Sequence, residues 1–211
     1  MTSRSTGSSG ALPGPTVHRL LGQASRDAFR HEEAEAASAG FTARALPACG
    51  QAVGEGRRFT GSLLRSWSLS PLVDNAALIV SELLSNALRY GLGALPARTG
   101  HGQDVWLGLL RRRGTVLFAV CDPSSAAPRL REPDFLAQSG RGLHIIDCLS
   151  EAWGWTTPGT DGKAVWAAVS CPAGSDGHDI PPAGEYPAAA RWAGPVMGPV
   201  ALRRPARGRT V

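Results

Sequence analysis

The most regular hydrophobic pattern of the chain lies between residues 72 and 88. Its apolar residues recur at intervals of three and four, which predicts one buried stripe on an α-helix. The stripe consists of Leu72, Ala76, Ile79, Val80, Leu83, Leu84, Ala87 and Leu88. Ser70 and Pro71 are suited to the cap and first position of this helix, and Gly91 is suited to its end.

Three polar residues of this segment, Glu82, Asn86 and Tyr90, follow one another at intervals of four. Four residues of α-helix turn through roughly 400°, so the three side chains form one row beside the apolar stripe. Such a row is commonly the wet face of an amphipathic helix. A carboxylate followed by an amide also suits a ligand and a metal ion, and the pattern alone leaves both interpretations open.

Strand and helix patterns alternate along the rest of the central chain. Residues 41–46 predict a strand, and residues 48–67 predict a helix. Three glycines near its beginning lower the helix propensity there, so its first residue is not defined by the pattern. Two hairpins follow, at 104–111 with 115–121 through R-R-G, and at 151–157 with 163–171 through P-G-T-D-G. Between the hairpins lie a polar loop at 122–139 and the short helical pattern L-H-I-I-D-C-L.

This order of elements predicts an α+β fold, a two-layer α/β sandwich in which helices cover one face of a mixed β-sheet. The domain is expected at residues 41–171. Residues 1–40 are expected to be largely disordered, with weak helical character at 17–39 that is best developed in H-E-E-A-E-A-A. Residues 172–211, rich in proline and glycine, are expected to form a disordered tail.

Composition narrows the class of protein. The chain has 211 residues, 43% of them hydrophobic, which suffices for one core. The net charge is +5, but no block of five like charges occurs, so a nucleic-acid arm is not indicated, and Arg111 to Arg113 read as a solvated turn. The four cysteines form no C-x-x-C pair. Without a signal peptide or an 18-residue apolar run, we expect a cytoplasmic protein.

Two further features suggest chemistry. Asp122 ends an apolar strand just before Pro123, where it either caps a turn or meets a ligand. The sequence Gly140-Arg141-Gly142 begins the short helix and is either an ordinary tight turn or a site where free amide groups attract phosphate. The residues alone do not decide between these alternatives.

The order and spacing of these motifs resemble the GHKL nucleotide-binding superfamily, and most closely its small anti-sigma-factor serine kinases. The resemblance covers residues 41–170. The motifs that carry it are V-S-E-L-L-S-N-A-L-R-Y-G, C-D-P-S-S, S-G-R-G-L-H-I-I-D and E-A-W-G-W followed by G-K-A-V-W-A-A-V. It implies a Bergerat-type fold that binds ATP and Mg²⁺.

The resemblance also implies roles for individual residues. Glu82 would act as general base or orient the attacking group, and Asn86 would hold Mg²⁺. Asp122 would accept a hydrogen bond from the amino group of adenine. The remaining contacts to phosphate and nucleoside would come from Arg89, Tyr90, Gly140, Arg141, Gly142 and Leu143.

The chain departs from the superfamily pattern at three places. Pro123, Ser124 and Ser125 replace the glycines that usually follow the aspartate. Ala164 stands where a hydroxyl residue commonly lies near the adenine, and Tyr90 stands where close relatives often have histidine. The second departure is expected to remove one contact to the base.

The function that the resemblance implies is ATP-dependent phosphorylation of Ser or Thr on an anti-sigma-factor antagonist, together with binding of a sigma factor. It also implies dimerisation. We expect no direct contact with nucleic acid and no membrane association. The alternative is a non-catalytic regulator that binds nucleotide or sequesters a partner protein.

Overall fold

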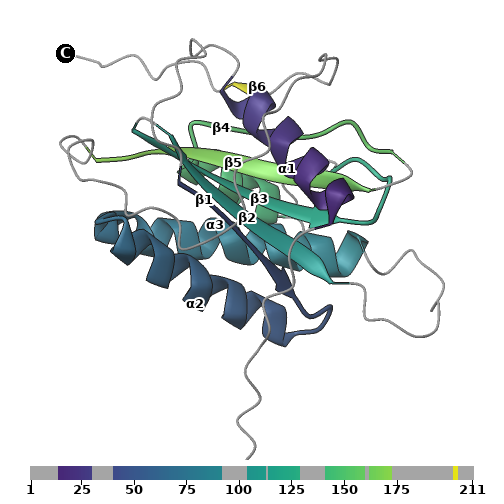
Figure 1. Cartoon of the computed structure of the whole chain (residues 1–211), viewed down its shortest axis with the longest axis horizontal. Helices are drawn as coiled ribbons and strands as arrows, with labels where there is room; N and C mark the ends of the chain where they lie inside the picture. Colours follow the sequence, from purple (N-terminus) through teal and green to yellow (C-terminus); the bar gives the residue numbers. More distant parts are fainter. Residues whose placement is uncertain are drawn as a thin grey trace, which may run out of the picture.

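A six-stranded antiparallel sheet is the centre of the computed structural model (Figure 1). The structure describes residues 14–29, 40–91, 104–112, 114–128, 141–159 and 162–172, and the backbone of 202–203. In order across the sheet, the strands are β1 (Gly40–Leu46), β2 (Val105–Arg112), β3 (Thr115–Asp122), β5 (Lys163–Ser170), β4 (Ala152–Trp155) and β6 (Leu202–Arg203).

Every strand pair among the described residues is antiparallel, so the prediction of a mixed sheet was wrong. The two helices that were predicted between β1 and β2 form an out-and-back path, which reverses the direction in which the chain re-enters the sheet. Two of the other four neighbouring pairs, β2 with β3 and β4 with β5, follow each other as hairpins. The first hairpin turns at Gly114, whose φ of 62° suits glycine.

Helices α2 (Gln51–Ser66), α3 (Val73–Asn86) and α4 (Gly142–Leu149) cover one face of the sheet. Figure 1 shows α2 and α3 side by side beneath the strands. The predicted stripe of α3 is buried at Ala76, Ile79, Val80, Leu83 and Leu84, where it meets Phe118 and Val120 of β3 in one core. The α+β class and the helix-on-sheet sandwich are therefore confirmed.

Helix α1 (Pro15–Ala28) lies on the opposite face of the sheet, where no helix was predicted (Figure 1). Its buried Leu20, Leu21 and Ala24 pack with the alternate side chains of β3 and β5. Pro15 suits the first turn because its missing N–H has no helical partner there. The expected disorder of residues 1–40 thus does not extend to 15–28, and H-E-E-A-E-A-A lies outside the described residues.

The ends of α3 differ from the prediction. Ser70 is not its cap but part of a 3₁₀ turn, Ser70–Leu72, and Leu72 precedes the helix without a side-chain cap. After Asn86 the chain widens into a π-helical turn, η2 (Ala87–Gly91). Such turns are frequent at functional sites because they redirect the side chains that follow.

Helix α2 begins close to its expected start in spite of its glycines. A Cβ atom on Gly56 would collide with Leu84 of α3 and lie 3.4 Å from Val80. The glycine therefore lets the two helices approach closely, and this packing offsets its low helix propensity. The predicted tail contributes two residues, Leu202–Arg203, whose backbone pairs with β4.

Arg111 was expected in a solvated turn, but it is buried with 3% of its surface exposed. Its Nη1 donates a 2.7 Å hydrogen bond to the carbonyl oxygen of Trp67, the residue that ends α2. Arg112, by contrast, is partly exposed and lies 5.5 Å from the centre of the Phe29 ring. The buried guanidinium therefore ties the end of α2 to the sheet.

We expect Arg111→Met to lower the free energy of unfolding by about 2 kcal/mol, because it leaves the Trp67 carbonyl without its charged donor. Urea denaturation followed by circular dichroism measures the change. Arg112→Met is the matched control and should cost well under half as much, since its cation–π contact is partly exposed. Equal losses in the two variants would contradict the role given to Arg111.

Candidate functional site

The predicted acid and amide meet the start of α4. Glu82 and Asn86 lie one turn apart on α3, and α3 packs against α4. A Cβ atom on Gly142 would lie 2.5 Å from Oε2 of Glu82 and 3.5 Å from Nδ2 of Asn86. Two motifs that are more than 50 residues apart in the sequence thus lie side by side, and a side chain at position 142 would displace that of Glu82.

Both polar side chains are available for a ligand. Glu82 and Asn86 are half-buried, and no hydrogen bond or ion pair joins either of them to another described residue. The first turn of α4 begins after Arg141, whose side chain does not cap it. Uncapped amide groups at a helix start attract anions. A carboxylate, an amide and the start of α4 therefore converge here.

Asp122 lies at the other end of the same helical segment. It ends β3, and Gly91, the last residue of η2, packs against it. A Cβ atom on Gly91 would lie 2.7 Å from both Cγ and Oδ1 of Asp122. From Glu82 to Gly91 the chain runs nine residues, roughly 13 Å at the rise of an α-helix. The segment α3–η2 thus connects the acid–amide group to Asp122.

Asp122 is not a free carboxylate, because Lys163 of β5 lies directly beside it. Nζ of Lys163 is 2.7 Å from Oδ1 of Asp122, and the side chains are 5% and 2% exposed. The backbone N–H of Ser124 donates to the same oxygen at 2.9 Å. Lys163 also reaches the carbonyl oxygen of Ser124 at 3.4 Å. The turn-stabilising interpretation of Asp122 therefore holds whatever else it binds.

Burial raises the pKa of Asp122, and the ion pair with Lys163 and the amide of Ser124 offset only part of that rise. The neighbouring Cys121 points to the other face of the sheet, into the cluster beneath α1. Burial, with a smaller contribution from the charge of Asp122, raises the pKa of its thiol well above the usual range. Cys121 is accordingly a neutral core residue.

Ala164 does not face Asp122, so the expected loss of a base contact at this position was wrong. Its side chain is fully buried in the cluster beneath α1, and its backbone N–H donates to Oγ1 of Thr156 at 2.9 Å. Side chains alternate along a strand, and β5 therefore turns Lys163 toward Asp122 and Ala164 away from it. Lys163 is therefore the residue of β5 that contacts Asp122, the residue predicted to bind the base.

Lys163 was missed in the sequence analysis although a signal was present. It is the single lysine among 22 basic residues, and it opens the strand directly after the D-G turn. Its cross-strand register with Asp122 required knowledge of the β3–β5 pairing, because 41 residues separate the two.

The other predicted contacts are less closely grouped. Arg89 and Tyr90 are exposed on η2, with the guanidinium carbon of Arg89 6.0 Å from the centre of the Tyr90 ring. Arg141 is exposed at the start of α4, and Leu143 is buried in the core. Gly140 lies outside the described residues. Roles in ligand binding for these residues stay predictions.

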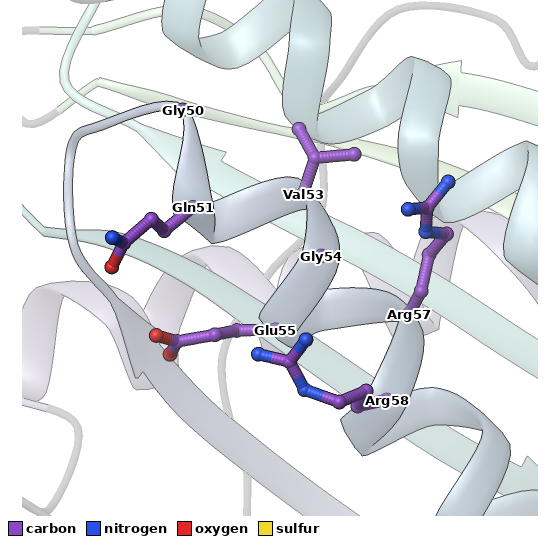
Figure 2. Close-up of a pocket in the computed structure, with 7 residues that line it drawn as sticks. All are labelled: Gly50, Gln51, Val53, Gly54, Glu55, Arg57 and Arg58. Atoms are coloured by element: carbon purple, nitrogen blue, oxygen red, sulfur yellow. The ribbon is translucent and has the colours of Figure 1, made fainter.

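A shallow hollow lies elsewhere, along the first half of α2 (Figure 2). It is open to solvent, and Figure 2 shows Glu55 and Arg58 on one side of the helix. Its lining comprises Gly50, Gln51, Val53, Gly54, Glu55, Arg57 and Arg58. None of the predicted site residues is among these, so the hollow gives no support to the nucleotide site.

Comparisons with known proteins do not identify the chain. No family model matches its sequence, and no curated protein matches it either. Within the part of the chain that the structure describes, no helix is long and apolar enough to cross a membrane.

The donor set fits a nucleotide-bound magnesium ion. Mg²⁺ favours hard oxygen ligands and takes part of its coordination from phosphates and water, so a single amide oxygen from Asn86 suffices on the protein side. The glycine at position 142 leaves space beside Glu82 and Asn86 that a larger residue would fill.

Proposed function

We propose that the chain binds ATP with Mg²⁺ and transfers the γ-phosphoryl group to a Ser or Thr hydroxyl of a partner protein. The observation that supports this most is the contact of Glu82 and Asn86 with Gly142, with Asp122 packed against Gly91 at the far end of the same helical segment. These contacts join residues of three of the four motifs that carry the family resemblance. A GHKL assignment of the detailed fold belongs to the same proposal.

In this mechanism the protein mainly positions groups and balances charge. Asn86 would hold the metal ion, and the first N–H groups of α4 would donate hydrogen bonds to the phosphates. Glu82 would take the proton of the acceptor hydroxyl as the phosphoryl group is transferred. Asp122 would accept a hydrogen bond from the base amino group, and Arg141, which is exposed at the start of α4, would contact the phosphates.

The partner proposed from the resemblance is an anti-sigma-factor antagonist, with a sigma factor as the second protein bound. Phosphate adds between one and two negative charges to the antagonist, and so changes which complex is stable. The same resemblance suggests a homodimer. No contact with nucleic acid or membrane is part of the proposal.

The test is transfer of labelled γ-phosphate to a co-purified antagonist. We expect Glu82→Ala to slow transfer by at least ~100-fold through loss of the base, and Asn86→Ala to weaken Mg²⁺-dependent ATP binding by roughly tenfold. Glu55→Ala and Asn75→Ala remove the same functional groups from α2 and from the exposed face of α3, and both should leave transfer unchanged. Transfer that survives both site substitutions would refute the kinase assignment.

One observation favours the second candidate, a regulator that binds a partner without catalysis. Lys163 engages the carboxylate that would recognise the base, and this ion pair can hold the loop after β3 in place without a ligand. A thermal shift caused by ATP in the absence of any transfer would support this regulator over the kinase.

A further inference from the structure

A buried ion pair sits where the proposed base-binding group lies, and it involves the single lysine of the chain. The remaining basic residues are arginines, and several described ones, such as Arg89 and Arg141, are exposed. Lys163 is instead 4% exposed and faces a carboxylate that is equally buried. A lysine is rarely buried unless it is paired, so its place beside Asp122 calls for a physical reason.

The two carboxylate oxygens of Asp122 differ in their hydrogen bonds. Lys163 and the N–H of Ser124 both donate to Oδ1. Oδ2 receives no hydrogen bond from any described residue. Oδ2 is therefore the acceptor that Asp122 has left to offer, whereas Oδ1 is held in place by the protein.

Among the described residues around Asp122, Lys163 is the one whose charge can balance that of the carboxylate. From η2, Asp122 is met by Gly91, which has no side chain, and from the following segment it is met by the Ser124 amide. Lys163 of β5 is the charged group that faces it among the described elements. A buried carboxylate stays ionised only when such a partner offsets its loss of hydration.

We infer that Lys163 is a positioning residue for the proposed nucleotide site: it fixes Oδ1 of Asp122 and balances its charge, so that Oδ2 is free to accept the amino group of adenine. The inference rests on the proposed function and deepens it, because it makes base recognition a property of the Asp122–Lys163 pair. Lys163 acts through Asp122 and does not itself contact the base.

A double-mutant cycle on the full chain tests this. The Kd of ATP·Mg²⁺ is measured by calorimetry for the native protein, Lys163→Met, Asp122→Asn and the double variant, below each unfolding transition. We expect Lys163→Met to weaken ATP binding at least roughly tenfold in the presence of Asp122. When it is added to Asp122→Asn, the same change should alter Kd less than about twofold, because there is no charge left to balance.

Two further measurements distinguish positioning from general damage. The loss of ATP affinity on acidification, as Asp122 protonates, should move to higher pH in Lys163→Met. Selective isotope labelling of lysine gives one side-chain signal in the native protein, and saturation with ATP·Mg²⁺ should shift it. This measurement needs no variant, so a signal that ATP does not move would overturn the inference even if Lys163→Met does not fold.

Each outcome has a definite meaning. An equal loss of affinity with and without the Asp122→Asn substitution would show that Lys163 does not act through Asp122, and would overturn the inference while leaving nucleotide binding intact. So would an unchanged Kd in Lys163→Met, tighter binding by that variant, or a lysine signal that ATP does not move. A native protein that binds no adenine nucleotide would overturn both the inference and the proposed function.

Discussion

Gly162→Ala should lower the free energy of unfolding by about 4 kcal/mol, through backbone strain and a clash that add together. Gly162 has φ of +92°, a conformation that costs an alanine roughly 1–2 kcal/mol. A Cβ atom on it would also collide with the carbonyl oxygen of Asp122 and lie 2.8 Å from Cα of Pro123. Both are backbone neighbours, so no side-chain rotation relieves the contact.

The neighbouring Gly159 provides the control, because the two glycines form an isolated bridge through reciprocal backbone hydrogen bonds. A Cβ atom on Gly159 would meet nothing within 4 Å. Gly159→Ala should therefore change stability by less than about 0.5 kcal/mol. Urea denaturation of both variants makes the comparison, and a loss below about 1 kcal/mol for Gly162→Ala would show that the turn relaxes readily.

The collision has a second consequence, because Gly162 precedes Lys163 and presses on the backbone of Asp122. A substitution there displaces both members of the ion pair, so ATP binding should weaken in parallel with stability if the proposed function holds. The close packing of Gly91 and Gly162 on Asp122 explains why these motif positions are glycines in this chain. Gly91 lets η2 approach the carboxyl group of Asp122, and Gly162 lets its own backbone approach that of Asp122 and Pro123.

The core of the fold could be predicted from the sequence where a pattern is both local and periodic. The stripe of α3, the strand at Phe41–Leu46 and the R-R-G hairpin all depend on residues close in sequence. Helix α1 was overlooked although Val17, Leu20, Leu21 and Ala24 follow a helical spacing, since a polar, Ser- and Gly-rich beginning masked it. The prediction of a mixed sheet was wrong, because the direction of a strand depends on how α2 and α3 together lead the chain back to the sheet. No local sequence pattern shows that path.

In the candidate site, too, features that depend on local spacing could be predicted, and features that depend on strand pairing could not. The row of Glu82 and Asn86 was visible as a four-residue spacing, and the structure places it against Gly142 as the motif order suggested. The orientation of Ala164 and Lys163 was not predictable, because a shift of one residue in strand register exchanges the faces. Likewise, the burial of Arg111 follows from the end of α2 lying over β2, a contact between residues 44 positions apart.

Lys163→Met should lower the free energy of unfolding by about 3 kcal/mol near neutral pH, because it leaves the carboxylate of Asp122 buried without a counter-charge. The double variant Asp122→Asn with Lys163→Met should recover most of this loss. Asparagine keeps an oxygen acceptor for the Ser124 amide, and neither side chain is then charged. Denaturation of the native protein and of both variants measures the difference, and a double variant less stable than Lys163→Met would contradict the account.

The loss of unfolding free energy in Lys163→Met, called the deficit below, should depend on pH with a definite sign. The pKa of Asp122 is already raised by burial in the native protein, and removal of Lys163 takes away the main effect that lowers it. The folded-state pKa then lies further above the unfolded value, so the folded chain holds the proton more tightly. Stability therefore falls as pH rises between the two pKa values. The deficit relative to the native protein should be smallest below the unfolded pKa of aspartate, near about 4, and should grow toward neutral pH. A deficit that is constant over this range would mean that the loss comes from packing around Lys163 rather than from the charge of Asp122.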